Sequence, residues 1–210
     1  MTRWLPILAL AGCTGTAPPD FQGEDMLDYF PFENNETCEW QYLSEDTNQT
    51  YRLLAHIENV ELVGEDRRYT VEYTKDCISD DPTCVEGDFV RSMTWSVQGN
   101  QGIHLHRVET EAGVKEFDPS LRFIDRYMKR ADTTTSEAGG NTYTTTLVEF
   151  GDCPVLLDWE GCAKLVVTSS GGPDQITGTY WVINDFNIVA MLWDDGGLPT
   201  WQLSNHITVE

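Results

Sequence analysis

The sequence contains few basic residues for its length. Among 210 residues there are 13 Lys and Arg against 35 Asp and Glu, which gives a formal net charge of −22. A surface of this sign repels nucleic-acid phosphates and anionic membrane surfaces, so we expect no nucleic-acid partner. The acids are spread along the chain, which favours a solvated acidic shell over a dedicated cation site.

The short motifs of common catalytic and cofactor sites are also missing. There is no EF-hand loop, no C-x-x-C pair, no G-x-S-x-G elbow and no G-x-x-x-x-G-K-[ST] loop. No internal repeat of fixed period is present. These absences predict a protein without cofactor or enzymatic activity. Because 35 acids single out no pair of carboxylates, a hydrolase is only a remote alternative.

No hydrophobic run near the start of the chain is long enough to span a membrane. The run Trp4–Ala11 is much shorter than the ~20 residues that a spanning helix needs, and it contains Pro6. Arg3 precedes the run, and small residues follow it. A charged start, a short apolar middle and a small-residue cleavage site are typical of a secretory signal peptide.

The tetrapeptide Leu10-Ala11-Gly12-Cys13 ends this run and resembles the lipobox of bacterial lipoproteins. The resemblance implies that residues 1–12 are removed as a signal peptide and that lipid, including palmitate, is attached to Cys13. Thr14 stands where inner-membrane lipoproteins have aspartate, which favours the outer membrane. The alternative is an ordinary Cys13 thiol beside a short buried segment at 4–11.

Five cysteines remain after Cys13, and an odd number cannot all pair. Cys77 is close in sequence to Cys84, and Cys153 is close to Cys162, with turn residues inside both intervals. An oxidising compartment permits these two disulfides, each worth roughly 2–3 kcal/mol in the chain-entropy model. Cys38 would then be a buried thiol, although other pairings, such as Cys38 with Cys153, stay open.

The rest of the chain reads as strands and turns. Residues 13–27 are rich in Gly, Pro and acids and are predicted to be a flexible tether that carries the lipidated Cys13. Alternating apolar and polar residues predict strands at 51–57, 68–74, 89–98, 103–109, 142–150, 162–169, 176–184, 187–194 and 201–209. Turns are expected at 64–66, 99–102, 139–141 and 171–174, with one short helix at 121–131. Residues 28–210 are therefore predicted to form one all-β domain, an antiparallel meander curved into an open barrel or half-barrel, or a sandwich.

A second resemblance rests on aromatic motifs. Asp28-Tyr29-Phe30-Pro31 is followed by Trp40-Gln41-Tyr42, and the chain closes with Gly178-Thr179-Tyr180-Trp181 and Asn187-Ile188-Val189. This order is similar to a poorly characterised group of exported, β-rich bacterial lipoproteins. The family has glycine before the tryptophan, where this chain has residues 36–39, and glycine in the closing motif, where this chain has Asn187. Because Asn tolerates positive φ, the second turn is expected to survive.

The aromatic residues of these motifs are expected to fill the core of a sheet protein that has little helix. The alternative is that Trp40, Tyr42 and Trp181 line a ligand site.

His104 and His106 are the weak candidates for a metal site. On a strand, residues two apart point to one face, so both could bind zinc if His56 or an acid supplied a third ligand. The alternative is two exposed polar residues on either side of an inward-pointing Leu105. The segment 169–172 is predicted to be a hairpin turn, and 194–197 an exposed acidic loop.

Together these observations predict an envelope lipoprotein anchored through Cys13 that acts as a non-enzymatic binding or structural module, with another envelope protein as partner. The alternative function is a carrier that holds a lipid or other apolar ligand in the concave face of a half-barrel.

Overall fold

The computed structural model describes residues 23–46, 49–77, 90–110, 113–154, 160–193 and 201–208. Over these ranges the protein is all-β, as predicted, and contains no helix. Accordingly, no helix in the described part has the length and apolar character of a membrane span. The strands are β1 (Glu24–Asp25), β2 (Cys38–Asp46), β3 (Gln49–Val63), β4 (Asp66–Cys77), β5 (Val90–Gln98), β6 (Gly102–Thr110), β7 (Gly113–Asp125), β8 (Tyr127–Met128), β9 (Thr133–Ala138), β10 (Asn141–Asp152), β11 (Glu160–Ser169), β12 (Gly178–Ile183), β13 (Asn187–Trp193) and β14 (Trp201–Thr208).

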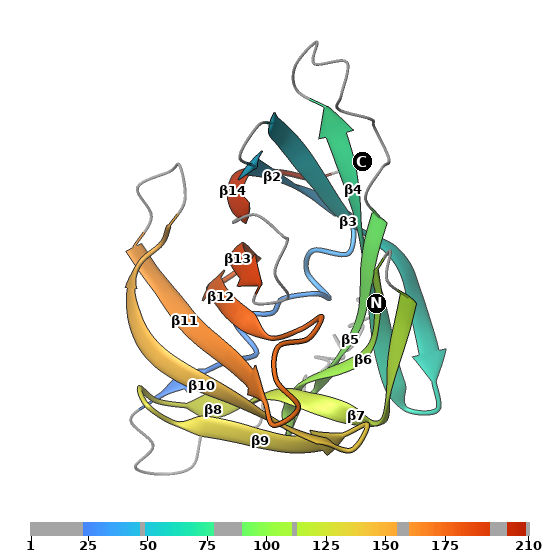
Figure 1. Cartoon of the computed structure of the whole chain (residues 1–210), viewed down its shortest axis with the longest axis vertical. Coiled ribbons are helices and arrows are strands. Elements are labelled where there is room, and N and C mark those ends of the chain that lie inside the picture. The colour runs from blue at the N-terminus through green and yellow to red at the C-terminus, as the bar shows by residue number, and fades with distance from the viewer. Residues whose placement is uncertain are drawn as a thin grey trace, which may run out of the picture.

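Twelve strands form one antiparallel sheet in the order β7-β6-β5-β4-β3-β2-β14-β13-β12-β11-β10-β9. The sheet curls until its edge strands, β7 and β9, lie against each other, so that it encloses an interior (Figure 1). No strand ladder joins these two edges, so the barrel stays open. The predicted antiparallel meander is therefore confirmed in its open-barrel form.

Alternation along each strand fills the interior with large side chains. In β4, Tyr69, Val71 and Tyr73 are buried, while the residues between them are partly exposed. Trp95 of β5 lies at the centre of an aromatic cluster, with Phe123 edge-on at 5.1 Å between ring centroids. A core of this kind explains why a chain without helices needs so many aromatic residues.

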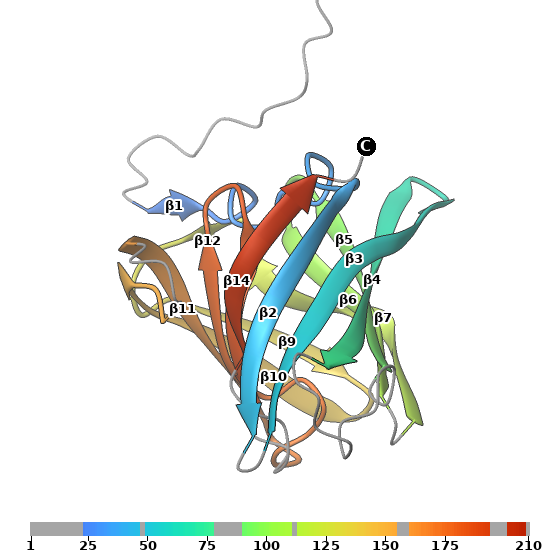
Figure 2. The same ribbon diagram turned by 90° about the horizontal axis from the view of Figure 1, so that it is seen from above.

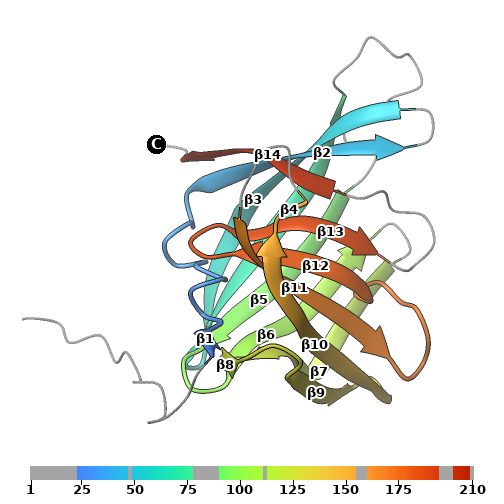
Figure 3. The same ribbon diagram turned by 90° about the vertical axis from the view of Figure 1, so that its left-hand side faces the viewer.

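Residues 26–37 close one end of the barrel. Met26, Phe30 and Phe32 are buried there, and Phe32 stacks on Tyr69 at 5.5 Å between centroids. Figure 3 shows this segment at one end of the strands, and the loop that connects β11 to β12 at the opposite end. We call residues 26–37 the plug.

The predicted tether extends too far into the folded domain. β1 pairs with β8 through Glu24↔Met128 and Asp25↔Tyr127, and the Asp25 carboxylate accepts from the Arg126 guanidinium at 2.8 Å. Residues 23–27 therefore belong to the domain. Residues 13–22 of the predicted tether lie outside the described part of the chain.

The predicted helix at 121–131 is wrong, because the region forms the end of β7, then β8. Leu121 and Phe123 are 1% exposed on either side of the half-exposed Arg122, which is the alternation of a strand. The predicted turns at 64–66, 99–102, 139–141 and 171–174 are present. Asn187 has φ 75°, the positive value that asparagine was expected to tolerate at this position.

The open barrel has two joints where strand pairing is absent or short. Between β7 and β9, the Thr134 hydroxyl accepts from the Asp125 backbone N–H at 2.8 Å and donates to the Asp125 carboxylate at 2.9 Å. The Ser136 hydroxyl likewise accepts from the Arg122 backbone N–H at 3.1 Å. The second joint lies between β13 and β14, whose described residues pair at Ala190↔Gln202 and Met191↔Trp201.

Candidate functional site

Two irregularities in the sheet converge on His106. Between β5 and β6, Thr94 is opposite Arg107 and Trp95 is opposite Leu105, so His106 is an extra residue in its strand. Between β6 and β7, the pairing jumps from Leu105↔Leu121 to Arg107↔Glu116, so residues 117–120 bulge out of β7. Such bulges re-aim side chains and often occur beside functional sites.

The bulge borders a polar groove of about 460 Å³ on the outer face of the sheet. Five strands, β3 to β7, supply its walls, and its lining residues are Glu61, Asp66, Arg68, Thr94, His106, Arg107, Glu116, Phe117, Asp118 and Ser120. Four carboxylates against two guanidinium groups make the groove acidic, like the chain as a whole. We call it the bulge groove.

Both candidate histidines lie on the outer face, on either side of the buried Leu105, and they are buried by their neighbours instead of exposed. His104 is 6% and His106 9% exposed. Burial, followed by the positive charge of Arg68, lowers the pKa of His106 to about 4. Burial, followed by Arg122, also lowers the pKa of His104. Both imidazoles are therefore neutral at physiological pH.

The described residues do not assemble a metal site at these histidines. No group of three or more His, Cys, Asp or Glu that could hold a metal ion occurs in the described ranges. His56, the proposed third ligand, faces Glu72 at 3.8 Å instead. His104 Nδ1 contacts the Ser120 hydroxyl at 3.1 Å, which uses one ring nitrogen in a bond to the β7 bulge.

Ser96, His106 and Asp66 come together in a grouping that the sequence did not suggest. The Ser96 hydroxyl lies 2.8 Å from His106 Nε2, and Asp66 Oδ2 lies 3.4 Å from the same nitrogen. In a hydrolytic triad the acid and the nucleophile engage opposite ring nitrogens. Ser96 is also 0% exposed, so its hydroxyl is not presented to a substrate. The grouping has the parts of a triad without its geometry.

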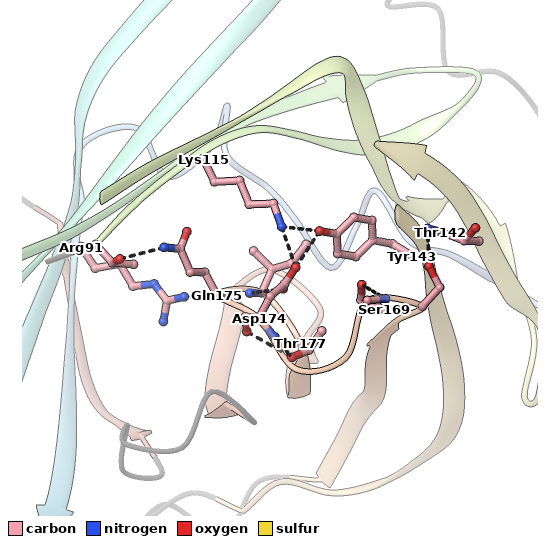
Figure 4. A network of polar contacts seen from close by, with 12 residues as sticks. Arg91, Lys115, Thr142, Tyr143, Ser169, Asp174, Gln175 and Thr177 are labelled. Atoms are coloured by element: carbon pink, nitrogen blue, oxygen red, sulfur yellow. Dashed lines mark hydrogen bonds and ion pairs between the residues drawn. The ribbon is translucent and has the colours of Figure 1, made fainter. Parts of the chain in front are cut away.

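A second polar cluster lies at the barrel end opposite the plug, where Lys115 and Tyr143 converge on Asp174 (Figure 4). The Lys115 ammonium lies 2.6 Å from Asp174 Oδ2, the Tyr143 hydroxyl donates to the same oxygen at 2.6 Å, and Lys115 also donates to Tyr143. The Ile176 backbone N–H donates to Asp174 Oδ1 at 3.1 Å. We call this cluster the clasp, because it joins β7, β10 and the β11–β12 loop.

The protonation states in the clasp suit a structural ion pair. Burial opposes the charge on Lys115, but its hydrogen bonds to Asp174 and Tyr143 outweigh that effect and raise its pKa. Burial likewise opposes the charge on Asp174, and the hydrogen bonds from Lys115, Tyr143 and Ile176 outweigh it and lower its pKa. A lysine held protonated is a poor nucleophile or base.

The three aromatic residues considered as ligand-lining are not gathered around one cavity. Trp40 and Tyr42 are 1% and 2% exposed and point into the barrel. The Trp40 indole N–H donates to the Phe186 carbonyl at 3.1 Å, and the Tyr42 hydroxyl donates to the Ile188 carbonyl at 2.7 Å. Trp181 lies on the outer face, where the Lys164 ammonium is 5.7 Å from its ring centroid. Because Trp181 points away from the barrel interior and Tyr42 points into it, the two side chains cannot line the same site.

The cysteines follow the predicted scheme as far as the structure describes them. Cys153 and Cys162 form a disulfide, which removes the alternative pairing of Cys38 with Cys153. Cys38 is a buried thiol, 5% exposed, that donates to the Asn35 side-chain oxygen at 3.4 Å. Cys77 is disulfide-bonded, whereas its predicted partner Cys84 lies outside the described residues.

Some predicted features fall outside the described ranges. These are the lipidation site Cys13, the signal segment 1–12 and the acidic loop at 194–197. The segment 169–172 forms the predicted hairpin turn, in which the Ser169 hydroxyl accepts from the Gly171 backbone N–H at 3.2 Å. The sequence patterns do not point to Ser96, Asp66 or Asp174. The sequence does contain one signal of the β7 bulge, Pro119 in Asp118-Pro119, because proline lacks the N–H that a regular strand ladder needs.

Comparison of the chain with protein-family models, with curated proteins and with solved structures gives no match. The resemblance of its aromatic motifs to bacterial lipoproteins stays a prediction.

Proposed function

We propose that this protein is a lipoprotein of the bacterial envelope, anchored through Cys13, whose β domain acts as a non-enzymatic binding or structural module. The lipobox-like Leu10-Ala11-Gly12-Cys13 carries the proposal. About ten residues separate it from the first described strand, so a lipid on Cys13 would not be attached directly to the domain. The outer membrane is the proposed location, because Thr14 follows the cysteine.

The polar clusters support binding over chemistry. Beside the bulge groove, Ser96 and Asp66 both contact the same ring nitrogen of His106, which is not the arrangement of a hydrolytic triad. In the clasp, Lys115 and Asp174 are held as a charged pair. The carrier alternative has less support, because the inward-facing aromatic residues around Trp95 pack against one another. The outer face of the sheet is therefore the proposed working surface.

Mass spectrometry of the protein extracted from native membranes tests the anchor. We expect a mature N-terminal peptide that begins at Cys13 and carries acyl groups, and we expect Cys13→Ser to lose both the lipid and the membrane fractionation. Thr14→Ala is the matched control, because it keeps the cysteine and changes its neighbour. A mature chain that starts elsewhere, or a Cys13→Ser protein that still fractionates with membranes, would contradict the proposal.

A further inference from the structure

The β3–β4 hairpin projects beyond the strands next to it (Figure 2). β3 pairs with β4 as far as Val63↔Asp66, whereas its pairing with β2 ends at Glu39↔His56. Residues 57–63 of β3 therefore have β4 on one side and no strand among the described residues on the other. We call these seven residues the free edge.

A free edge of this kind offers backbone hydrogen-bonding groups to another chain. In an antiparallel pair, alternate residues direct their N–H and C=O groups away from the partner strand. Proteins protect such edges with bulges, proline or lysine, because an added strand pairs with them readily. Here one bulge lies between Ile57 and Asn59, and the remainder continues without proline or lysine.

One face of the free edge presents two exposed apolar side chains. Val60 is opposite Tyr69 and Leu62 is opposite Arg67, so Val60 and Leu62 share a face, and they are 36% and 72% exposed. Two adjoining grooves of about 620 Å³ and 370 Å³ run along this side and share Glu36 and Thr37 as lining residues. There is thus room for a strand and its side chains beside β3.

The charges around the free edge select the sign of its occupant. Glu36, Glu39 and Glu61 line the two grooves, and Glu58 is exposed on the edge itself. The nearby guanidinium groups are already paired, Arg67 with Glu36 at 2.6 Å and Arg68 with Asp66 at 3.6 Å. Among the described residues, Glu39, Glu58 and Glu61 therefore supply the acidic charge of the edge. A second copy of a chain with net charge −22 would be repelled, whereas a basic segment would be attracted.

We propose that the free edge binds an extended, basic segment of a partner protein by strand addition. The seven edge residues match a peptide of about seven residues at ~3.3 Å each. Its apolar side chains lie beside Val60 and Leu62, and its alternate Lys or Arg side chains lie on the opposite face beside Glu61. This inference rests on the proposed binding function and names its surface and the chemistry of the partner.

Binding of designed peptides to the full chain in mild detergent tests the proposal. The probe is a fluorescent peptide in which Lys alternates with Val over seven residues, and fluorescence anisotropy gives its Kd. We expect the double variant Val60→Lys with Leu62→Lys to weaken binding at least tenfold, and a Glu-for-Lys peptide to bind at least tenfold more weakly to the wild type. Because both substituted positions are exposed, thermal melts should show an unchanged fold. Val114→Lys, at an apolar residue of β7 that is 51% exposed, is the matched control and should bind like the wild type.

The mode of binding is tested on the backbone. Only alternate N–H groups of the peptide would point toward β3. N-methylation of those residues should therefore abolish binding, and N-methylation of the residues between them should not. Peptide binding should also slow amide exchange at 57–63. Equal binding of the acidic peptide, or exchange unchanged at 57–63, overturns the proposal. The proposal is also overturned if the protein dimerises through this edge, or binds phosphatidylglycerol vesicles through it, but does not bind the peptide. Mass spectrometry of Cys13 is independent of these results, so a failed anchor and a failed edge are distinguishable.

Discussion

At the residue scale, Trp40 and Tyr42 of β2 form hydrogen bonds across the joint between β13 and β14. The described residues of those strands pair at two positions, and near this joint the carbonyls of Ile188, in β13, and of Phe186, just before it, accept side-chain hydrogen bonds. The Trp40 indole and the Tyr42 hydroxyl are the donors. Buried carbonyls without a donor are costly, so these side chains contribute by hydrogen bonding as well as by packing.

Tyr42→Phe tests the hydrogen bond from the Tyr42 hydroxyl to the Ile188 carbonyl. The substitution keeps the ring and leaves the buried Ile188 carbonyl without its donor, so we expect the free energy of unfolding to fall by ~1–3 kcal/mol, measured by urea denaturation. Tyr29→Phe is the control, since among the described residues the Tyr29 hydroxyl makes no hydrogen bond, and it should change stability by less than ~0.5 kcal/mol. Equal losses in both variants would mean that the phenol matters only through packing.

His106 predicts a specific loss of stability in mild acid. Its pKa is near 6.5 when unfolded and about 4 when folded, so the unfolded chain binds the proton more tightly. The stability that this neutral imidazole provides is therefore complete above pH 6.5 and declines as pH falls toward 4, by up to about 3 kcal/mol. The lowered pKa of His104 has the same sign.

Denaturation curves between pH 7 and pH 4 measure this decline, and His106→Asn should flatten it. His56→Asn is the control, because His56 lies at the surface beside Glu72. A decline that is identical in wild type and His106→Asn would show that other groups dominate acid stability.

At the element scale, alternation in the sequence predicts nine of the 14 described strands, but it misses β1, β2, β7, β8 and β9 and does not give the joints between strands. Tyr69-Thr70-Val71-Glu72-Tyr73 reads as a half-buried strand because one face of β4 is apolar. The 121–131 region was misread, because β7 is interrupted by the bulge at 117–120 and its alternation resumes only over Leu121 and Phe123. The plug and the grouping at His106 depend on residues far apart in sequence, which local patterns do not bring together.

The joint between β7 and β9 depends on Thr134, which is 1% exposed. Thr134→Val keeps the shape of the side chain but removes the acceptor of the Asp125 backbone N–H and the donor to its carboxylate. We expect a loss of ~1–3 kcal/mol in the free energy of unfolding, and faster amide exchange in β7 and β9. The exposed neighbour Thr135→Val should be within about 0.5 kcal/mol of the wild type, and an equal loss there would argue against the joint.

At the scale of the whole molecule, the packed interior and the plug leave the outer surface and the edges as the surfaces proposed to bind a partner. The bulge groove and the free edge both lie outside the core, and both are rich in carboxylates. The same excess of acid that favours a basic partner also acts on the fold, because like charges are closer together in the folded chain than in the unfolded one.

A net charge of −22 therefore predicts that salt stabilises the protein. Raising NaCl from ~10 mM to ~150 mM shortens the Debye length from about 30 Å to about 8 Å and screens the self-repulsion. We expect calorimetry to show that Tm rises by a few degrees. The same screening weakens exposed ion pairs such as Arg52–Asp76, but each such pair is worth less than ~1 kcal/mol, so this opposing effect is small. A variant that neutralises four exposed acids should have a higher Tm at low salt and a weaker dependence of Tm on salt. The four substitutions lie on β1, on the β3–β4 hairpin and in the β7 bulge: Glu24→Gln, Glu58→Gln, Glu65→Gln and Asp118→Asn. A Tm that falls with NaCl, or that rises equally in this variant, would mean that local ion pairs or bound ions outweigh the overall repulsion.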